Sequence, residues 1–141
     1  MAAIKRLGVG ALAGFGIGFL VLGSTARLAM HGIALATGGS QGFSFAGSLE
    51  VLFFSALVGL PSGLAFVVLR SRLPRSSMRS GLLLGAGLFV ATSALLPARF
   101  QSLASSFEGM LWLVFLLFGI CFLIHGVCLA RAVDAVLSSP G

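Results

Sequence analysis

Few side chains in this 141-residue chain could take part in chemistry, and most of them stand alone in apolar sequence. The stretch from Gly23 to Glu50 is the first of interest, because it carries Arg27, His31 and Glu50 among mostly apolar residues. His31 follows Arg27 by four residues and therefore lies on the same face of a helix. Charged groups in such surroundings cost free energy unless they are paired, reach water or have a function. This stretch is therefore a candidate for part of a functional site.

A second group of reactive side chains consists of Cys121, His125 and Cys128, which share one helix face. The two cysteines lie about 10.5 Å apart along a helix axis. That distance is too long for one tetrahedral zinc ion or for a disulfide between them. We therefore predict no metal site and interpret the cysteines as small apolar residues.

His125 has three interpretations: a hydrogen-bonded residue of a helix bundle, a proton relay, or the axial ligand of a haem or chlorophyll-type pigment. Ligation of a haem by both histidines is excluded, because the helix rise places His31 and His125 more than ~20 Å apart in depth. No cofactor is expected, and a pigment or haem at His125 is the alternative.

No catalytic motif is present. The chain has no HExxH, no GxSxG and no phosphate-binding loop, and it contains only three acidic residues. We therefore expect that the protein is not an enzyme.

The composition defines the elements that must position these residues. Charged residues make up 9% of the chain and hydrophobic residues 58%, with a mean hydropathy of +1.14, whereas a soluble domain has about 25% charged residues. Four apolar runs, each long enough or nearly long enough to cross a bilayer, cover about residues 7–35, 48–69, 81–98 and 109–130. The first resembles a secretory signal but is longer than one. The sequence therefore predicts one domain, residues 1–141, that is an all-α, integral membrane four-helix bundle.

The cations indicate how this bundle is oriented. If the four runs alternate in direction, one side carries seven of them: Lys5, Arg6, Arg70, Arg72, Arg75, Arg79 and Arg131. The positive-inside rule then places this side, with both termini, in the cytoplasm. The basic residues therefore set topology and attract anionic lipid headgroups, and a nucleic-acid partner is not expected.

The other side has balanced charges, which are predicted to form an outer-face polar cluster of Arg27, His31, Glu50, Arg99 and Glu108. Each helical hairpin contributes one arginine and one glutamate at this level. The glutamates have two interpretations. They are helix caps and ion-pair partners in first turns, or they belong to a proton or solute site.

Helix packing and a hinge are indicated by glycine and proline. Gly10, Gly14 and Gly18 form a row on one helix face, a glycine zipper that lets another backbone approach closely. Pro61 lies in the middle of the second run, where it removes a backbone hydrogen bond and is a candidate hinge. The spacing of Gly10 and Gly14 recurs at Gly81 and Gly85, which suggests a parallel repeat of two hairpins.

One further pattern links helices 1 and 2. It consists of Arg27, Met30-His31, a glycine-rich loop, Phe43-Ser44-x-x-Gly47-Ser48-Leu49, and Leu69-Arg70 before a short basic loop. This order resembles small four-span integral membrane proteins of bacteria with no assigned function, in which arginine is more common than histidine after the methionine. The resemblance implies a four-helix membrane fold and no particular activity.

The sequence is compatible with two functions. The first is an accessory or structural subunit of a larger membrane complex, with membrane lipids and other subunits, or copies of itself, as partners. The alternative is an oligomeric transporter or channel for small solutes or ions, with the outer-face polar cluster around its mouth. In either case the expected location is the bacterial cytoplasmic (inner) membrane.

Overall fold

The computed structural model describes residues 2–36, 38, 45–95 and 111–138. Every element within these ranges is a helix, which confirms the all-α prediction for the described residues. The helices are α1 (Ala2–Ile17), the π-helical segment η1 (Gly18–Leu22), α2 (Gly23–Ala36), α3 (Phe45–Leu69), α4 (Ser77–Leu95) and α6 (Leu111–Ser138).

Among the residues that the structure describes, three stretches of helix are long and apolar enough to cross a membrane: Ile4–Ala36, Phe45–Leu69 and Trp112–Leu137. The chain is therefore a membrane protein by the length and composition of its helices. The helix α4 is not among these stretches. It has 19 residues and begins with Ser77, Arg79 and Ser80 in its first turn, which lowers its hydropathy. A fourth span therefore stays a prediction.

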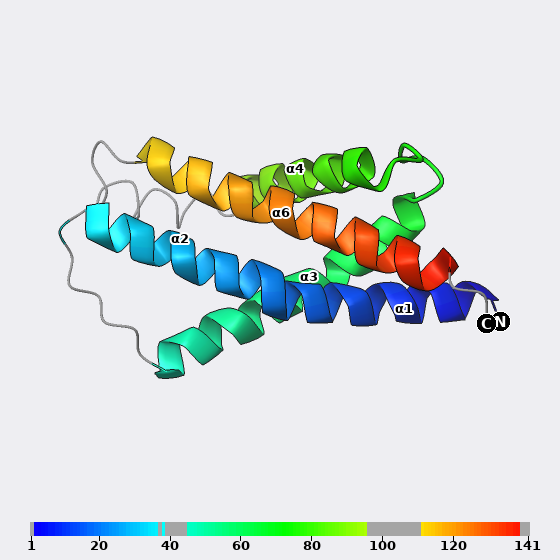
Figure 1. Cartoon of the computed structure of the whole chain (residues 1–141), viewed down its shortest axis with the longest axis horizontal. Helices are drawn as coiled ribbons and strands as arrows, with labels where there is room; N and C mark the ends of the chain where they lie inside the picture. Colours follow the sequence, from blue (N-terminus) through cyan, green and yellow to red (C-terminus); the bar gives the residue numbers. More distant parts are fainter. Residues whose placement is uncertain (1, 37, 39–44, 96–110, 139–141) are drawn as a thin grey trace.

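Figure 1 shows how the helices are arranged. The segments α1, η1 and α2 form one continuous rod, α3 crosses this rod, and α6 lies over it with α4 alongside. The start of α1, the end of α6 and the turn of residues 70–76 lie together at one end of the molecule, which we call the Arg70 end. The end of α2 and the starts of α3 and α6 lie at the opposite end, which we call the far end.

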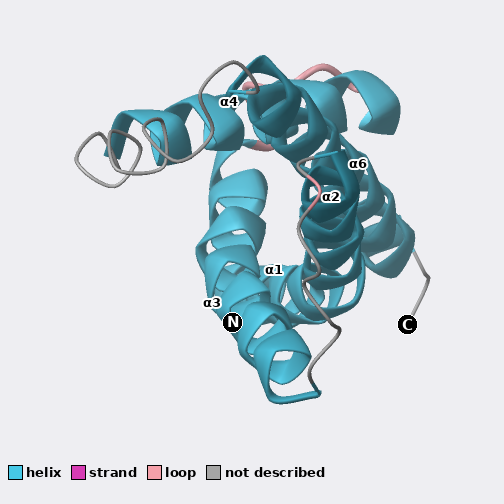
Figure 2. Ribbon diagram, turned by 90° about the vertical axis from the view of Figure 1, so that its left-hand side faces the viewer, coloured by secondary structure: helices cyan, strands magenta, loops and turns pink. Residues whose placement is uncertain are grey.

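The helices form two closely packed pairs, seen from another side in Figure 2. In the first pair, the rod packs on α3 through glycine. A Cβ atom added to Gly10 would lie 2.8 Å from the Gly63 carbonyl oxygen, and one added to Gly18 would lie 2.8 Å from the Gly59 Cα. One added to Gly14 would meet the Gly59 carbonyl oxygen and lie 2.9 Å from the Gly63 Cα. Only glycine allows backbones to approach this closely.

The second pair, α4 with α6, has the same kind of contact. A Cβ atom on Gly81 would lie 2.7 Å from the Gly126 carbonyl oxygen, and one on Gly85 would lie 2.9 Å from the Leu123 Cα. Two glycines four residues apart thus meet a glycine of the partner helix in both pairs, at Gly63 in the first and Gly126 in the second. This equivalence is what a parallel repeat of two hairpins would produce.

Helix α6 joins the two pairs, because it contacts α1, η1 and α2 as well as α4. Near the Arg70 end, the buried cluster contains Phe66 of α3, Leu84 of α4, and Leu129, Ala130 and Val133 of α6, with Ala13 and Ile17 of α1 packed against it. A smaller cluster joins Leu22, Ala29 and Cys121. Together with the partly buried side chains packed against them, these clusters include residues of every described helix.

The described helices differ in several bounds from the ranges read from the sequence. The first begins at Ala2 rather than near residue 7, and α3 begins at Phe45 rather than near residue 48. Helix α6 continues to Ser138, beyond the apolar run that was expected to end near residue 130, and α4 begins at Ser77 rather than near residue 81. The added turns carry Arg131 and Asp134 in α6 and Arg79 in α4. Hydropathy marks where the hydrocarbon ends, whereas a helix continues through charged residues that reach water.

Candidate functional site

The most deeply buried polar contact joins α3 to α6 near the middle of the bundle. The His125 side chain is 0% exposed, and its Nε2 atom lies 2.9 Å from Ser62 Oγ. Ser62 is also fully buried and donates its hydroxyl hydrogen to the Gly59 carbonyl oxygen at 2.6 Å. A serine hydroxyl has one hydrogen, so His125 Nε2–H must be the donor to Ser62. This pairing fixes the tautomer of the imidazole.

The other ring nitrogen, His125 Nδ1, has no hydrogen-bond partner in the described part of the chain. In the tautomer fixed by Ser62 it is a bare acceptor.

A π-helical segment and a proline inside a helix belong to the elements around this contact. Segment η1 is π-helical over Gly18–Leu22, and the Gly23 N–H donates to the Gly18 carbonyl oxygen, five residues back. Helix α3 runs unbroken through Pro61, which precedes Ser62 and lacks an N–H of its own. π-Helical turns are often found at functional sites, so the His125–Ser62 pair is a candidate site.

These residues do not fit a haem or chlorophyll-type pigment. Axial ligation needs a bare imidazole nitrogen and room for a macrocycle beside it. Nε2 is bonded to Ser62, and Nδ1, although bare, belongs to a ring that is fully buried between helices. Ligation would require that α3 and α6 separate.

The cysteines are both free thiols: Cys121 is buried and Cys128 is partly buried. Cys121 packs with Leu22 and Ala29 in an apolar cluster. Across residues 2–36, 38, 45–95 and 111–138, no three His, Cys, Asp or Glu side chains come together in a way that could hold a metal ion.

The predicted outer-face polar cluster is only partly covered by the structure. Arg27 donates from Nε and Nη2 to Ser48 Oγ, at 3.2 and 2.8 Å, and so joins α2 to α3. His31 is partly buried and also has an interaction, whereas Glu50 is exposed. Arg99 and Glu108 lie outside the described residues. The arginine–glutamate network therefore stays a prediction, and Ser48 is a partner of Arg27 that charge counting could not reveal.

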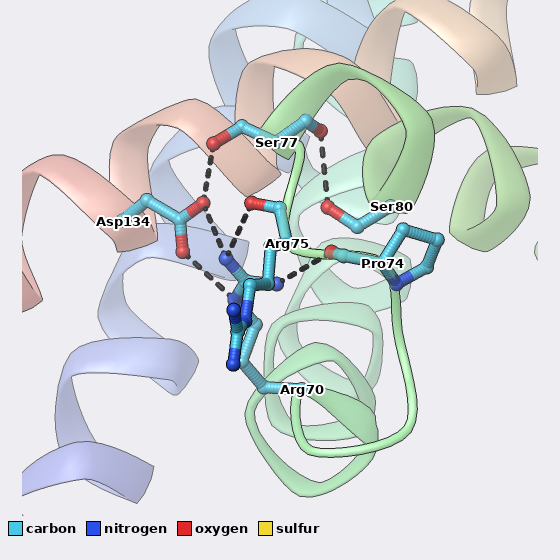
Figure 3. A network of polar contacts seen from close by, with 6 residues as sticks. All are labelled: Arg70, Pro74, Arg75, Ser77, Ser80 and Asp134. Atoms are coloured by element: carbon cyan, nitrogen blue, oxygen red, sulfur yellow. Dashed lines mark hydrogen bonds and ion pairs between the residues drawn. The ribbon is translucent and has the colours of Figure 1, made fainter.

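Sequence reasoning missed a second polar network at the Arg70 end (Figure 3). Arg70 binds Asp134 with two hydrogen bonds of 3.0 Å each, from Nε to Oδ1 and from Nη2 to Oδ2. Its Nη1 atom donates to the Pro74 carbonyl oxygen at 2.9 Å, and its guanidinium lies 5.7 Å from the centre of the Phe66 ring. Ser77 donates its hydroxyl hydrogen to Asp134 Oδ2. One carboxylate thus holds together the end of α3, the turn, the start of α4 and the end of α6.

The sequence contains one signal that could have found this network. Asp134 is the single acidic residue on a side predicted to carry seven cations, so it had to have a cationic partner. The sequence could not identify Arg70 as that partner, because the two residues are 64 positions apart.

An open hollow of about 620 Å³ borders this network, lined by Arg6, Arg70, Ser77, Arg131, Asp134, Ala135 and Leu137. It lies on the surface at the Arg70 end rather than inside the bundle.

No family model, curated protein or solved structure matches the chain. The function therefore depends on this geometry alone.

Proposed function

We propose that the protein is an accessory subunit that binds other transmembrane polypeptides through α2. The observation that carries the proposal is the length of the first apolar helix. The stretch Ile4–Ala36 has 33 residues and is therefore ~50 Å long, compared with ~30 Å of hydrocarbon. Its last nine residues, 28–36, extend past Arg27. Arg27 marks one membrane interface, about 31 Å along the helix from Arg6.

Helix α2 nevertheless exposes large apolar side chains. Leu28 is 66% exposed, Leu35 is 67% exposed and Met30 is 40% exposed. Gly32 lies between the two leucines on the same face, and a Cβ atom added there would meet no atom within 4 Å. An open glycine between leucines suits the close approach of another helix. Ala29 and Ile33, on another face of α2, are buried inside this chain.

The interior of the chain favours this function over transport by one copy. The hollow at the Arg70 end is open to the surface, and glycine contacts close both helix pairs. A rigid body with an apolar outer surface is suited to assembly with other subunits.

The orientation and location belong to this proposal. We infer that the Arg70 end faces the cytoplasm, because Lys5, Arg6, Arg131 and the basic 70–76 turn support the positive-inside rule there. The membrane would then be the bacterial cytoplasmic membrane, as the resemblance of helices 1 and 2 suggests. A fourth span at α4 completes the bundle.

The test is native mass spectrometry of the protein from membranes solubilised in mild detergent. We expect reproducible masses of other polypeptides with the wild type, and their loss with Gly32→Leu. Gly87→Leu is the matched control, because Gly87 of α4 is also exposed and also has no atom within 4 Å of an added Cβ. A complex made only of copies of this chain, or equal effects of the two variants, would contradict the proposal.

A second candidate function is transport by an oligomer, which one observation favours. His125 Nδ1 is buried without a hydrogen-bond partner among the described residues, and the other nitrogen of the ring bonds Ser62, which directly follows Pro61 in α3. Such a group could accept a proton during a cycle. Reconstituted liposomes test this. For a transporter, the wild type should give flux that is lost in Glu50→Gln and in His125→Gln. For an accessory subunit, neither the wild type nor the variants should give flux.

A further inference from the structure

The hollow at the Arg70 end combines a net positive charge with an apolar wall. Three guanidinium groups, those of Arg6, Arg70 and Arg131, and one carboxylate, that of Asp134, line it. Their charges give the lining a net charge of +2. Ala135 and Leu137 supply the apolar part of the wall.

The positive charge is not neutralised inside the protein. The Asp134 carboxylate is already bound by Arg70 through two hydrogen bonds and by Ser77 through a third. Arg6 and Arg131 are both exposed, and neither has a hydrogen-bond or ion-pair partner in the part of the chain that the structure describes. Two guanidinium groups thus face the hollow with their donors open.

The hollow is also built on a rigid base. Arg70 cannot swing into it or away from it without breaking its bonds to Asp134 and to the Pro74 carbonyl oxygen. Arg6 comes from α1 and Arg131 from α6, two helices that contact each other. The two open guanidinium groups are therefore held on neighbouring helices rather than on a loop.

The depth of the site matches the level of lipid headgroups. Arg6 lies near the start of the apolar stretch Ile4–Ala36, and Arg131 lies near the end of the stretch Trp112–Leu137. Cations at such positions reach the interface between hydrocarbon and water. A phosphate there can accept paired hydrogen bonds from arginine, and an acyl chain can lie along the exposed apolar helices.

We propose that this hollow is a binding site for the headgroup of an anionic phospholipid, whose phosphate is bound by Arg6 and Arg131. Arg70 is a positioning residue that fixes the floor of the site through Asp134. The inference does not depend on the accessory function, because a transporter could hold the same lipid.

The experiment is native mass spectrometry of purified protein titrated with phosphatidylglycerol, and with phosphatidylcholine as the zwitterionic reference. The site variant is Arg6→Gln/Arg131→Gln. The matched control is Arg72→Gln/Arg79→Gln, which removes the same charge from exposed residues at the same end that do not line the hollow. We expect the site variant to bind phosphatidylglycerol at least about tenfold more weakly than the control variant, since each arginine near an anionic headgroup adds about one kcal/mol.

Two further measurements separate the possible outcomes. Arg6→Lys/Arg131→Lys keeps the charge and should retain part of the binding, and equal thermal unfolding temperatures of all variants exclude a folding defect. Inorganic phosphate added at millimolar concentration should not displace the lipid, because its acyl chains also contribute to binding. Equal losses in the site and control variants, equal binding of phosphatidylcholine, or displacement by inorganic phosphate would each overturn the proposal.

Discussion

At the scale of single residues, Asp134 holds the Arg70 end together. It accepts two hydrogen bonds from Arg70 and one from Ser77. Among the described residues at that end it is the one acidic side chain, and several cations surround it. Asp134→Ala leaves the Arg70 guanidinium without its carboxylate, so we expect the free energy of unfolding in detergent to fall by about 1–2 kcal/mol. Arg72→Ala, which removes an exposed arginine from the same turn, should change it by less than about 0.5 kcal/mol. Equal effects of the two variants would mean that the ion pair contributes nothing.

The buried pair of Ser62 and His125 gives a second prediction at this scale. Ser62→Ala removes the acceptor of His125 Nε2–H and leaves both imidazole nitrogens without a partner. We expect a loss of about 0.5–1.5 kcal/mol in the free energy of unfolding, the range found for hydrogen bonds between membrane helices. Ser24→Ala, at an exposed position of α2, is the control. A double-mutant cycle with His125→Ala measures the coupling, and a coupling of zero would contradict the bond.

The sequence revealed some of these residues and not others. It indicated that His125 could be a hydrogen-bonded residue inside a bundle, because an imidazole in an apolar helix needs a partner. It could not identify Ser62, since serine is common in this chain and its partner depends on how α3 crosses α6. The Arg70–Asp134 pair was missed for the same reason: pairing at long sequence separation is a property of packing.

At the scale of elements, the glycine contacts explain how close the helices come. Gly14→Ala places a Cβ atom against the backbone of α3, and Gly85→Ala does the same against α6. We expect each to lower the free energy of unfolding by about 1–3 kcal/mol, because backbone atoms cannot move aside. Gly16→Ala and Gly87→Ala are the matched controls, since an added Cβ there meets no atom within 4 Å. These should be neutral or slightly stabilising, as alanine favours helix more than glycine does.

The π-helical segment η1 gives a prediction about helix register. A turn closed by hydrogen bonds five residues apart holds one residue more than an α-helical turn. Deletion of the exposed Leu20 should therefore convert η1 to α-helix and leave the buried faces of α1 and α2 in place. Deletion of Leu12, which is also exposed, rotates the start of α1 by about 100°. Gly10 then loses its contact with Gly63 of α3. We expect thermal unfolding to show a much larger loss for the second deletion, and equal losses would contradict this account of η1.

The end of an apolar run was used to predict the end of each helix, and this works only where the two coincide. This holds for α3, which ends at Leu69, as predicted. It fails for α6, because Arg131 and Asp134 continue the helix while their charges reach water and the hollow. The π-helical turn has no sequence signal of its own, since Gly18–Leu22 reads as ordinary apolar helix.

At the scale of the whole molecule, the distribution of charge predicts which end faces the cytoplasm. In a variant with Cys121 and Cys128 replaced by alanine, single cysteines at Ser71 and Ala46 report on the two ends, since both positions are exposed. A membrane-impermeant maleimide added to intact cells should label Ala46→Cys and not Ser71→Cys, and both should be labelled after lysis. Labelling of Ser71→Cys in intact cells would contradict a cytoplasmic Arg70 end.

The architecture also has a consequence for how the chain is made. The rod and α3 are neighbours in sequence and pack on each other through Gly10, Gly14, Gly59 and Gly63, so this hairpin is synthesised in full before α6 begins. Helix α6 then has to pair with α4 and, in the same step, dock on that hairpin, because it supplies the contacts that join the two pairs. Until α6 docks, Ser62 lacks its partner His125 and Arg70 lacks its partner Asp134. We therefore expect chains stalled before α6 to be recognised by membrane proteases as incomplete, while their first hairpin is already protected.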